Sequence, residues 1–522
     1  MRGARRAGVV LLSTLLMVGG LLAPPAGAAA GKETRLAEQL VRGVSVGDAN
    51  RHLIALQRIA SQNGGNRASQ DQTADDPGFR ASIQYVAKAM RDLGFQVQVQ
   101  NFNYEVEVIN TDSITGSGLA ESIYIDQMTD SISAPVGGIT APLAVVPVNP
   151  AGTGCDPSDF AGKDYTGKIA LIMRGTCPFS QKATNAAAAG ALLAVIYNNA
   201  PEALSGTLAG VDVSIPVGGI SGADGAILQT QAGMTITVDM NSTTFTRQSQ
   251  NVIAQTRTGR TDNVIMAGAH LDSVAAGPGI NDNGSGSAAL LELAQTLGSS
   301  PKTTNAIRFG WWGAEELGLI GSTKYVEKLP FQRQLDIAMY LNFDMIGSPN
   351  AGYFVYDGNE TLGQGDIPAP PGSAQIEQTF VSFFNERLQV QTEDTEFDGR
   401  SDYQAFIAAG IPAGGLFTGA EDIKTADQVT LWGGTAGVAY DKCYHQACDT
   451  IDNVDDVVLG KMGDGIAHAV FTLGEVTTKW KGWGNGHHGH GWGNGHGWGD
   501  KGSNWGDKGW SGWDHGGKHG GR

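Results

Sequence analysis

Positive charge is scarce in this sequence. It contains 35 Lys and Arg residues against 52 Asp and Glu residues, which gives a formal net charge of −17 at pH 7. A surface with that excess of negative charge repels phosphate groups. Nucleic acid and anionic membranes are therefore poor candidates as partners.

Long apolar runs are absent after the first residues. Residues 1–28 contain three Arg residues near the start, an apolar run from Val9 to Leu22 and a small-residue motif at positions 26–28, which is typical of a secretory signal peptide. The run is shorter than the roughly 20 residues that cross a bilayer, so we expect a soluble, secreted, extracellular protein without a membrane span. A retained lipid-embedded anchor is the alternative. Removal of the leader would leave a net charge of about −20.

Cysteine is also rare, and its four residues fall into two local pairs. They are Cys155, Cys177, Cys443 and Cys448. An exported chain permits disulfides, and pairing each cysteine with its sequence neighbour is the simplest of three connectivities. A four-cysteine zinc site is disfavoured because neither pair has C-x-x-C spacing.

The chain is long enough for two folded domains. Helical spacing of apolar residues predicts helices over 50–62 and 81–93, and alternation predicts a strand over 95–108. From about 107 to 246 charge thins out, and short β-rich runs surround one Ala-rich helix. This segment reads as an inserted domain without catalytic groups of its own. The parts 29–106 and 247–478 would together form the second, discontinuous domain.

The later part of the chain alternates buried strands with helices. Strands are predicted within 263–271, 305–312 and 336–343, and a glycine-rich turn feeds a helix over 286–297. This rhythm predicts an α/β fold with a mixed, mostly parallel central sheet flanked by helices. In such sheets functional groups gather at the carboxyl ends of the strands.

The last residues, 479–522, form a low-complexity tail rich in Gly, Trp and His. Seven of the ten tryptophans and six of the ten histidines lie there. So much glycine raises the entropy of ordering, and no apolar period offsets it, so we expect disorder. The tail could buffer metal or stack on wall sugars, but an inert extension is the favoured interpretation.

Candidate catalytic groups follow the predicted strands. His270 ends the first strand, Asp282 lies in the turn after it, the neighbours Glu315 and Glu316 follow the second strand, and Asp344 follows the third. His445 lies far downstream in CYHQACDT. Five of these six groups suffice for two metal ions, each with one His, one carboxylate and a share of a bridging carboxylate. Such mixed ligands suit zinc best, with cobalt or manganese as substitutes.

The adjacent carboxylates suggest a division of labour. Two divalent cations would offset the cost of clustering buried acids. Residues adjacent at a strand end point in different directions, so Glu315 and Glu316 should not share one role. We expect one of them to bind metal and the other to act as a general base.

These motifs resemble a known family, the M28 aminopeptidases of clan MH. The resemblance rests on AHLDSV, GINDNGSG, WWGAEELGLIGS, LNFDMIG, DGRSDYQAF and CYHQACDTIDN, together with NGGNRA near residue 63. The inserted segment resembles the protease-associated (PA) domain, with a core at about 137–235, in GKIALIMRGTCPFSQKATNAAAAGALLAVIYNN and IPVGGIS.

The resemblance implies a role for each group. One zinc ion would be bound by His270 and Asp344, a second by Glu316 and His445, and both by Asp282. Glu315 would be the general base, Asp272 would orient His270, and Tyr444 would hydrogen-bond the oxyanion. The free ammonium of a peptide substrate would lie near Glu315 and Asp344. Arg400 would contact substrate or product, and a Cys443–Cys448 disulfide would brace the loop carrying Tyr444 and His445.

Several alternatives remain open at this level. Asp272 could be a solvated carboxylate, Tyr444 could be packing, and Arg400 could form an ordinary salt bridge. The acidic run Asp452, Asp455 and Asp456 could bind Ca²⁺, although a helix start is favoured. A carboxypeptidase or dipeptidase on the same scaffold and a secreted binding protein are the competing functions. An apolar, leucine-like preference and a monomeric state are expectations only.

Overall fold

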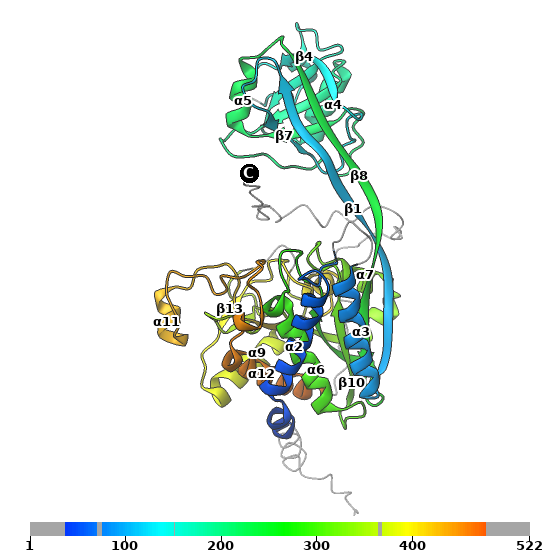
Figure 1. Ribbon diagram of the computed structural model, residues 1–522, viewed down its shortest axis with the longest axis vertical. Coiled ribbons are helices and arrows are strands. Elements are labelled where there is room, and N and C mark those ends of the chain that lie inside the picture. Colours follow the sequence, from blue (N-terminus) through cyan, green and yellow to red (C-terminus); the bar gives the residue numbers. More distant parts are fainter. Residues whose placement is uncertain (1–36, 70–75, 151, 364–367, 477–522) are drawn as a thin grey trace, which may run out of the picture.

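The computed structural model describes residues 37–69, 76–150, 152–363 and 368–476. The predicted signal peptide (1–28) and the predicted tail (479–522) lie outside these residues. Within the described part, no helix combines the length and the apolar character that crossing a lipid bilayer requires. The strands form one continuous sheet whose two halves belong to two units, joined by a long two-stranded ribbon (Figure 1).

The main unit is built on six strands. They are β9 (Arg260–His270), β10 (Asn305–Trp312), β11 (Ile337–Phe343), β12 (Phe354–Tyr356), β13 (Glu393–Thr395) and β14 (Ala413–Phe417). Their order is β13-β12-β14-β11-β9-β10, and β14, β11, β9 and β10 run parallel to one another, whereas β12 is antiparallel to β14. The predicted mixed, mostly parallel sheet is confirmed.

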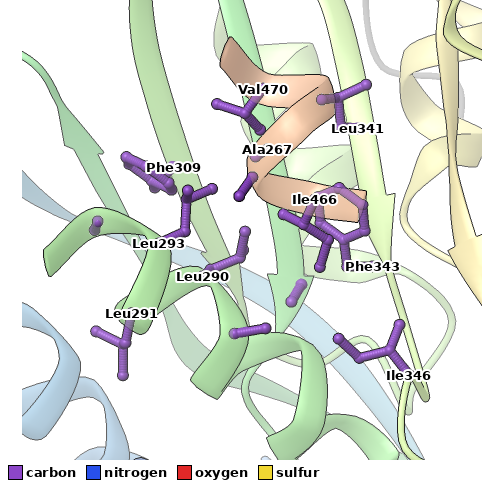
Figure 2. Packing of buried hydrophobic residues seen from close by; sticks show 14 of the residues in the cluster. Ala267, Leu290, Leu291, Leu293, Phe309, Leu341, Phe343, Ile346, Ile466 and Val470 are labelled. Atoms are coloured by element: carbon purple, nitrogen blue, oxygen red, sulfur yellow. The ribbon is translucent and has the colours of Figure 1, made fainter. Parts of the chain in front are cut away.

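Helices cover both faces of this sheet. One face packs against α2 (Val46–Gln62), α3 (Pro77–Asp92), α6 (Gly286–Leu297), α9 (Ser373–Ser382) and α12 (Asp456–Gly474). Figure 2 shows part of that core, where Leu290, Leu293, Ile466 and Val470 meet Ala267, Phe309, Leu341 and Phe343. The other face packs against α7 (Ile320–Lys328) and α10 (Tyr403–Ala408). Successive strand residues point to opposite faces, so Trp311 enters the first core and Trp312 the second.

The ribbon consists of β1 (Gln96–Gly116) and β8 (Thr235–Gln255), which pair antiparallel along their whole length. The sequence pattern predicted a strand over 95–108, and the structure extends it to residue 116. Its partner lies more than a hundred residues downstream, which local periodicity does not reveal. The predicted domain boundaries near 107 and 246 both fall inside the ribbon, so the division into domains stays a prediction.

The inserted unit comprises the elements between β1 and β8. Its parallel strands are β4 (Ile139–Val145), β5 (Ile169–Met173), β6 (Leu193–Tyr197) and β7 (Val217–Ile220), and its helices include α4 (Phe179–Ala188) and α5 (Gly222–Gln229). Separate apolar cores lie on the two faces of these strands. Because both faces are buried, the strands read as continuous apolar runs. The helix α4 contains the predicted Ala-rich segment, and α5 was not predicted.

The carboxyl ends of the main strands lie on the side of the inserted unit. The strand β8 pairs with β4 at residues 235–238 and with β10 at residues 252–255, so it runs from the inserted unit into the main unit. Since β10 is antiparallel to β8, its carboxyl end points back towards the inserted unit. The carboxyl ends of its parallel neighbours β9 and β11 point the same way.

Candidate metal and catalytic centre

Three side chains from three segments meet beyond the end of β9. The Nε2 atom of His270 lies 3.1 Å from Oδ1 of Asp282 and 3.3 Å from Oδ1 of Asp344. His270 is the last residue of β9, and Asp344 directly follows β11. Both carboxylates and the imidazole are buried. One His and two carboxylates at this separation form a set of ligands that a divalent cation can share.

A second set of three groups shares Asp282 with the first. The Nε2 atom of His445 lies 3.1 Å from Oδ2 of Asp282 and 3.1 Å from Oε2 of Glu316. The two oxygens of Asp282 therefore face different histidines. In the part of the chain that the structure describes, these two sets are the clusters able to hold a metal ion. The structure thus brings together all five predicted ligands, in the predicted grouping.

The chemistry of this donor set fits bound cations. Oε1 of Glu316 and Oδ1 of Asp344 are buried and accept no hydrogen bond from a described residue. Burial and the neighbouring Asp282 raise the pKa of Glu316 to about 7. Burial also raises the pKa of Glu315 far above its usual range, and the nearby Asp402 and Asp344 add to this. Two divalent cations would compensate these buried acids, and mixed imidazole and carboxylate ligands suit zinc.

The pKa values of the two imidazoles are raised as well, which for a histidine favours the charged form. Burial alone lowers the pKa of His270, but the carboxylates of Asp344 and Glu315 outweigh it, so the pKa lies well above its ordinary value. For His445 the hydrogen bonds to Asp282 and Glu316 likewise outweigh burial and raise the pKa to about 10. The site therefore holds positive charge strongly, as a cation-binding centre must.

Two buried acids that the sequence did not single out hold Asp282 in place. Both oxygens of Asp449 accept backbone N–H groups, from Asn281 at 2.8 Å and from Asp282 at 3.0 Å. Asp441 accepts from the side chain of Asn281 at 2.7 Å and from the backbone N–H of Cys443 at 2.7 Å. These contacts tie the turn carrying Asp282 to the loop carrying His445.

A chain of buried hydrogen bonds orients Asp344. Tyr340 accepts from the indole of Trp312 at 2.8 Å and donates to Asn342 at 3.0 Å. Asn342 donates to the hydroxyl of Ser401 at 2.8 Å, and Ser401 donates to Oδ2 of Asp344 at 2.6 Å. These linked hydrogen bonds hold the carboxylate of Asp344 in place from the core outward.

The loop carrying Glu315 and Glu316 is closed by a side chain from β8. Asn251 is fully buried; it accepts from the N–H of Gly313 at 3.2 Å and donates to the carbonyl of Gly321 at 2.8 Å. A Cβ on Gly313 would lie 2.6 Å from the carbonyl oxygen of Gln250, and one on Gly321 would lie 2.3 Å from the carbonyl oxygen of Gly313. Only glycine fits at these two points, because the loop returns so close to itself and to the ribbon.

Three residues other than glycine next to the site have a positive φ, in the left-handed region of the backbone. They are Ala314 before Glu315, Met345 after Asp344, and His445 itself. Such conformations cost about 1–3 kcal/mol each and persist where the surroundings impose them. The backbone at each ligand segment is therefore held by its packing and hydrogen bonds.

Asp272 lies beside His270, as predicted, but its contacts are divided. The backbone carbonyl of Asp272 is 3.2 Å from Nδ1 of His270, whereas its carboxylate Oδ1 is 3.8 Å away. That same Oδ1 accepts the backbone N–H of Glu315 at 3.2 Å. Burial raises the pKa of Asp272 to about 6. The residue thus contacts both the ligand and the predicted base.

Tyr444 and Arg400 lie together beside the candidate ligand His445. Arg400 donates to the hydroxyl of Tyr444 at 3.3 Å and to Oε1 of Glu421 at 2.8 Å, and both charged side chains are about half exposed. Burial raises the pKa of Tyr444 well above its ordinary value, which keeps its hydroxyl a donor. The ring of Tyr444 stacks on that of His445, with centroids 3.8 Å apart.

Both predicted disulfides are present. Cys443 and Cys448 join at the two ends of the short loop that presents Tyr444 and His445, and Cys155 joins Cys177 in the inserted unit. In the acidic run, Asp455 accepts from the N–H groups of Val457 and Val458 and so caps α12. The helix start that was favoured over calcium binding is thus confirmed.

Two further buried charged residues lie near the site and were not predicted from the sequence. Arg67, in the NGGNRA motif, donates to the carbonyls of Leu271, Pro278 and Gly279 and so ties the end of β9 to the turn before Asp282. Asp402 is buried close to Asp344. Burial, with the added repulsion of Asp344, raises the pKa of Asp402 to about 8.

Comparison with known sequences gives two domain families. The model of peptidase family M28 matches residues 251–470, and the PA domain model matches residues 139–228. The chain is 47% identical over 425 residues to the probable lipoprotein aminopeptidase LpqL of Mycobacterium tuberculosis, covering 80% of this chain and 83% of that protein. It is 42% identical to an aminopeptidase of Pseudomonas aeruginosa, over 84% of this chain and 83% of that protein.

Solved structures agree with the fold. An aminopeptidase from Aneurinibacillus sp. strain AM-1 superposes with a TM-score of 0.61 at 28% identity, covering 84% of this chain and 96% of that chain. A zinc aminopeptidase from Bacillus subtilis gives a TM-score of 0.53 at 28% identity, covering 81% and 95%.

Proposed function

Since this chain belongs to peptidase family M28 and carries a PA domain inserted ahead of its M28 core, we propose that it is a zinc-dependent aminopeptidase, a hydrolase that removes amino-terminal residues from peptides. The observation that carries the proposal is the pair of ligand sets sharing Asp282, with Glu315 beside them. Relatives named as aminopeptidases, at 47% and 42% identity over most of the chain, support the same activity.

Each zinc ion would have its own ligands in addition to Asp282. One would be held by His270 and Asp344 and the other by Glu316 and His445. Bound zinc supplies Lewis-acid polarisation of a carbonyl and of water. Ser401, Asp449 and Asp441 fix the ligand carboxylates and their backbone, so the chain provides a preorganised centre.

Glu315 is the proposed proton carrier. Its Oε2 lies 3.8 Å from Nε2 of His270, farther than either proposed carboxylate ligand. It takes a proton from water and returns it to the leaving amine. The hydroxyl of Tyr444 donates a hydrogen bond to the carbonyl oxygen as negative charge develops there. The substrate ammonium lies near Glu315 and Asp344, whose charge favours a free amino terminus.

We further propose secretion and a preference for apolar first residues. The amino-terminal pattern and two disulfides support export. A relative named leucine aminopeptidase 2 in Arthroderma otae, 42% identical over 75% of this chain and 77% of that protein, supports a leucine-like substrate. The inserted unit faces the carboxyl ends of the strands and would restrict large substrates.

A carboxypeptidase or dipeptidase on this scaffold is the second candidate. It requires a cation for the terminal carboxylate, and the cation nearest Tyr444, Arg400, is engaged by Glu421. Peptides blocked at the amino end and at the carboxyl end separate the two. Cleavage of only the amino-blocked peptide would replace the proposed activity. No hydrolysis together with zinc well below two per chain would favour a binding protein.

The adjacent glutamates give the sharpest experiment. Release of p-nitroaniline from leucine p-nitroanilide is measured with and without a chelator, alongside the zinc content of each variant. Glu316→Gln should lower zinc content, whereas Glu315→Gln should keep zinc and lose turnover. The exposed Glu327→Gln in α7 is the control for loss of one negative charge. Full activity and full zinc in both site variants would refute the proposed roles.

A further inference from the structure

Along one of its two edges, β8 has a gap, a stretch with no paired strand among the described residues. In an antiparallel ladder, the backbone groups of alternate residues point to opposite edges. The carbonyl of Met240 and the N–H of Ser242 point away from β1, because they bond to Ala134 and Ser133. The same two-residue period carries the outward direction along the strand through Thr244, Thr246 and Gln248. The register shift of the ribbon lies in β1 and leaves this period intact.

Both ends of that outer edge are occupied. At residues 235–238 it pairs with β4, and at residues 252–255 it pairs with β10. Between them, the outward N–H and C=O groups of Thr244, Thr246 and Gln248 form no hydrogen bond with any residue that the structure describes. All three residues are exposed. The gap has the length of a short strand, about 13 Å from residue 244 to residue 248.

The gap begins at the catalytic loop. The strand β10 leaves β8 after Trp311 opposite Val252, and its chain turns at Gly313, where a Cβ would lie 2.6 Å from the carbonyl oxygen of Gln250. Glu315 follows two residues later. The free edge therefore continues the line of β10, from the candidate site towards the inserted unit (Figure 1).

We propose that this edge binds the backbone of the peptide substrate, as an added strand formed by residues downstream of the scissile bond. The proposal rests on the aminopeptidase function. Exposed strand edges bind extended peptides by main-chain hydrogen bonds and are otherwise covered in folded proteins. Such binding depends little on side chains. The enzyme would therefore favour extended peptides of about five residues or more over dipeptides and anilides, with broad tolerance of downstream sequence.

The test removes one outward donor without disturbing the ribbon. Proline is accepted in a strand where its missing N–H faces away from the paired neighbour. Thr246→Pro should lower the ratio of kcat/KM for a leucine-initiated hexapeptide to kcat/KM for leucine p-nitroanilide by about fivefold, the factor expected for one ordinary hydrogen bond. Thr246→Ala, which keeps the N–H, should retain the wild-type ratio. An equal ratio in all three proteins would overturn the proposal, as would a parallel fall with both substrates.

A measurement on the unaltered enzyme covers the case in which Thr246→Pro fails to fold. Single N-methylation at successive downstream amides of the hexapeptide should reduce kcat/KM at alternate positions only. A uniform or absent effect would refute edge pairing. A fall in sedimenting mass of Thr246→Pro would instead assign the edge to a second copy of this chain. Absence of leucine p-nitroanilide hydrolysis by the wild type would refute the proposed function itself, a distinct outcome.

Discussion

Replacement of Asn251 by alanine should damage both stability and turnover. The N–H of buried Gly313 would lose its acceptor, which costs about 1–3 kcal/mol, and loss of the bond to the carbonyl of Gly321 costs about 1 kcal/mol more. The free energy of unfolding should fall by about 2–4 kcal/mol. Because the released loop carries Glu315 and Glu316, kcat should fall by up to about 10²-fold, the effect of misplacing a catalytic group by about 1 Å.

Urea denaturation and leucine p-nitroanilide kinetics measure the two effects. The control is Gln100→Ala, because half-buried Gln100 accepts one hydrogen bond from Asn251 at 3.0 Å and forms none with Gly313 or Gly321. That variant should lose less than about 1 kcal/mol and keep its kcat. A stability loss in Asn251→Ala without any change in kcat would refute the positioning argument. Unchanged stability would refute the hydrogen-bond argument as well.

Three further outcomes follow from other parts of the molecule. Ser401→Ala, which removes the donor to Asp344, should weaken zinc binding by about 10- to 100-fold, as measured by equilibrium dialysis. Removal of zinc that had been present at about 100 times its Kd should cost about 2.7 kcal/mol of stability for each of the two sites, visible by calorimetry as a lower Tm. Burial lowers the pKa of His52 to about 4, below its ordinary value of 6.5. The neutral, buried His52 therefore stabilises the folded state fully above pH 6.5, and this contribution to the free energy of unfolding is lost as the pH falls towards 4. His52→Gln should flatten that part of the profile, and an unchanged profile would contradict this assignment.

The grouping of the site could be predicted because its ligands follow strand ends. His270 is the last residue of β9, Asp344 directly follows β11, and Glu316 lies in the loop just after β10, and parallel strands end at one edge. Local periodicity contains that information. The neighbours Glu315 and Glu316 differ in their contacts as the argument about opposite directions requires, since Glu316 lies 3.1 Å from His445 and Glu315 lies nearer His270.

The supporting contacts could not be predicted, because they join segments far apart in the chain. Asn251 closes a loop about 60–70 residues away, and Asp449 binds the turn at Asp282 across 167 residues. Nothing in the sequence around Asn251 distinguishes it from ordinary polar residues, and the motif CYHQACDTIDN contains Asp449 without showing which segment it binds. The pairing of β1 with β8 was missed for the same reason, since each strand shows its own alternation but not the identity of its partner.

The ribbon also explains how a large insertion leaves the main fold intact. Asn103 lies opposite Gln248, so the chain departs for the inserted unit and returns from it at neighbouring points. For the main unit, the insertion is therefore equivalent to a single hairpin loop between β1 and β8. Closing a loop costs only about 0.6 kcal/mol for each doubling of its length, and the inserted unit, with two cores of its own, holds its two ends together. An antiparallel pair can also be closed by a turn of two residues, so the pairing of β1 with β8 near the main unit does not require the inserted unit.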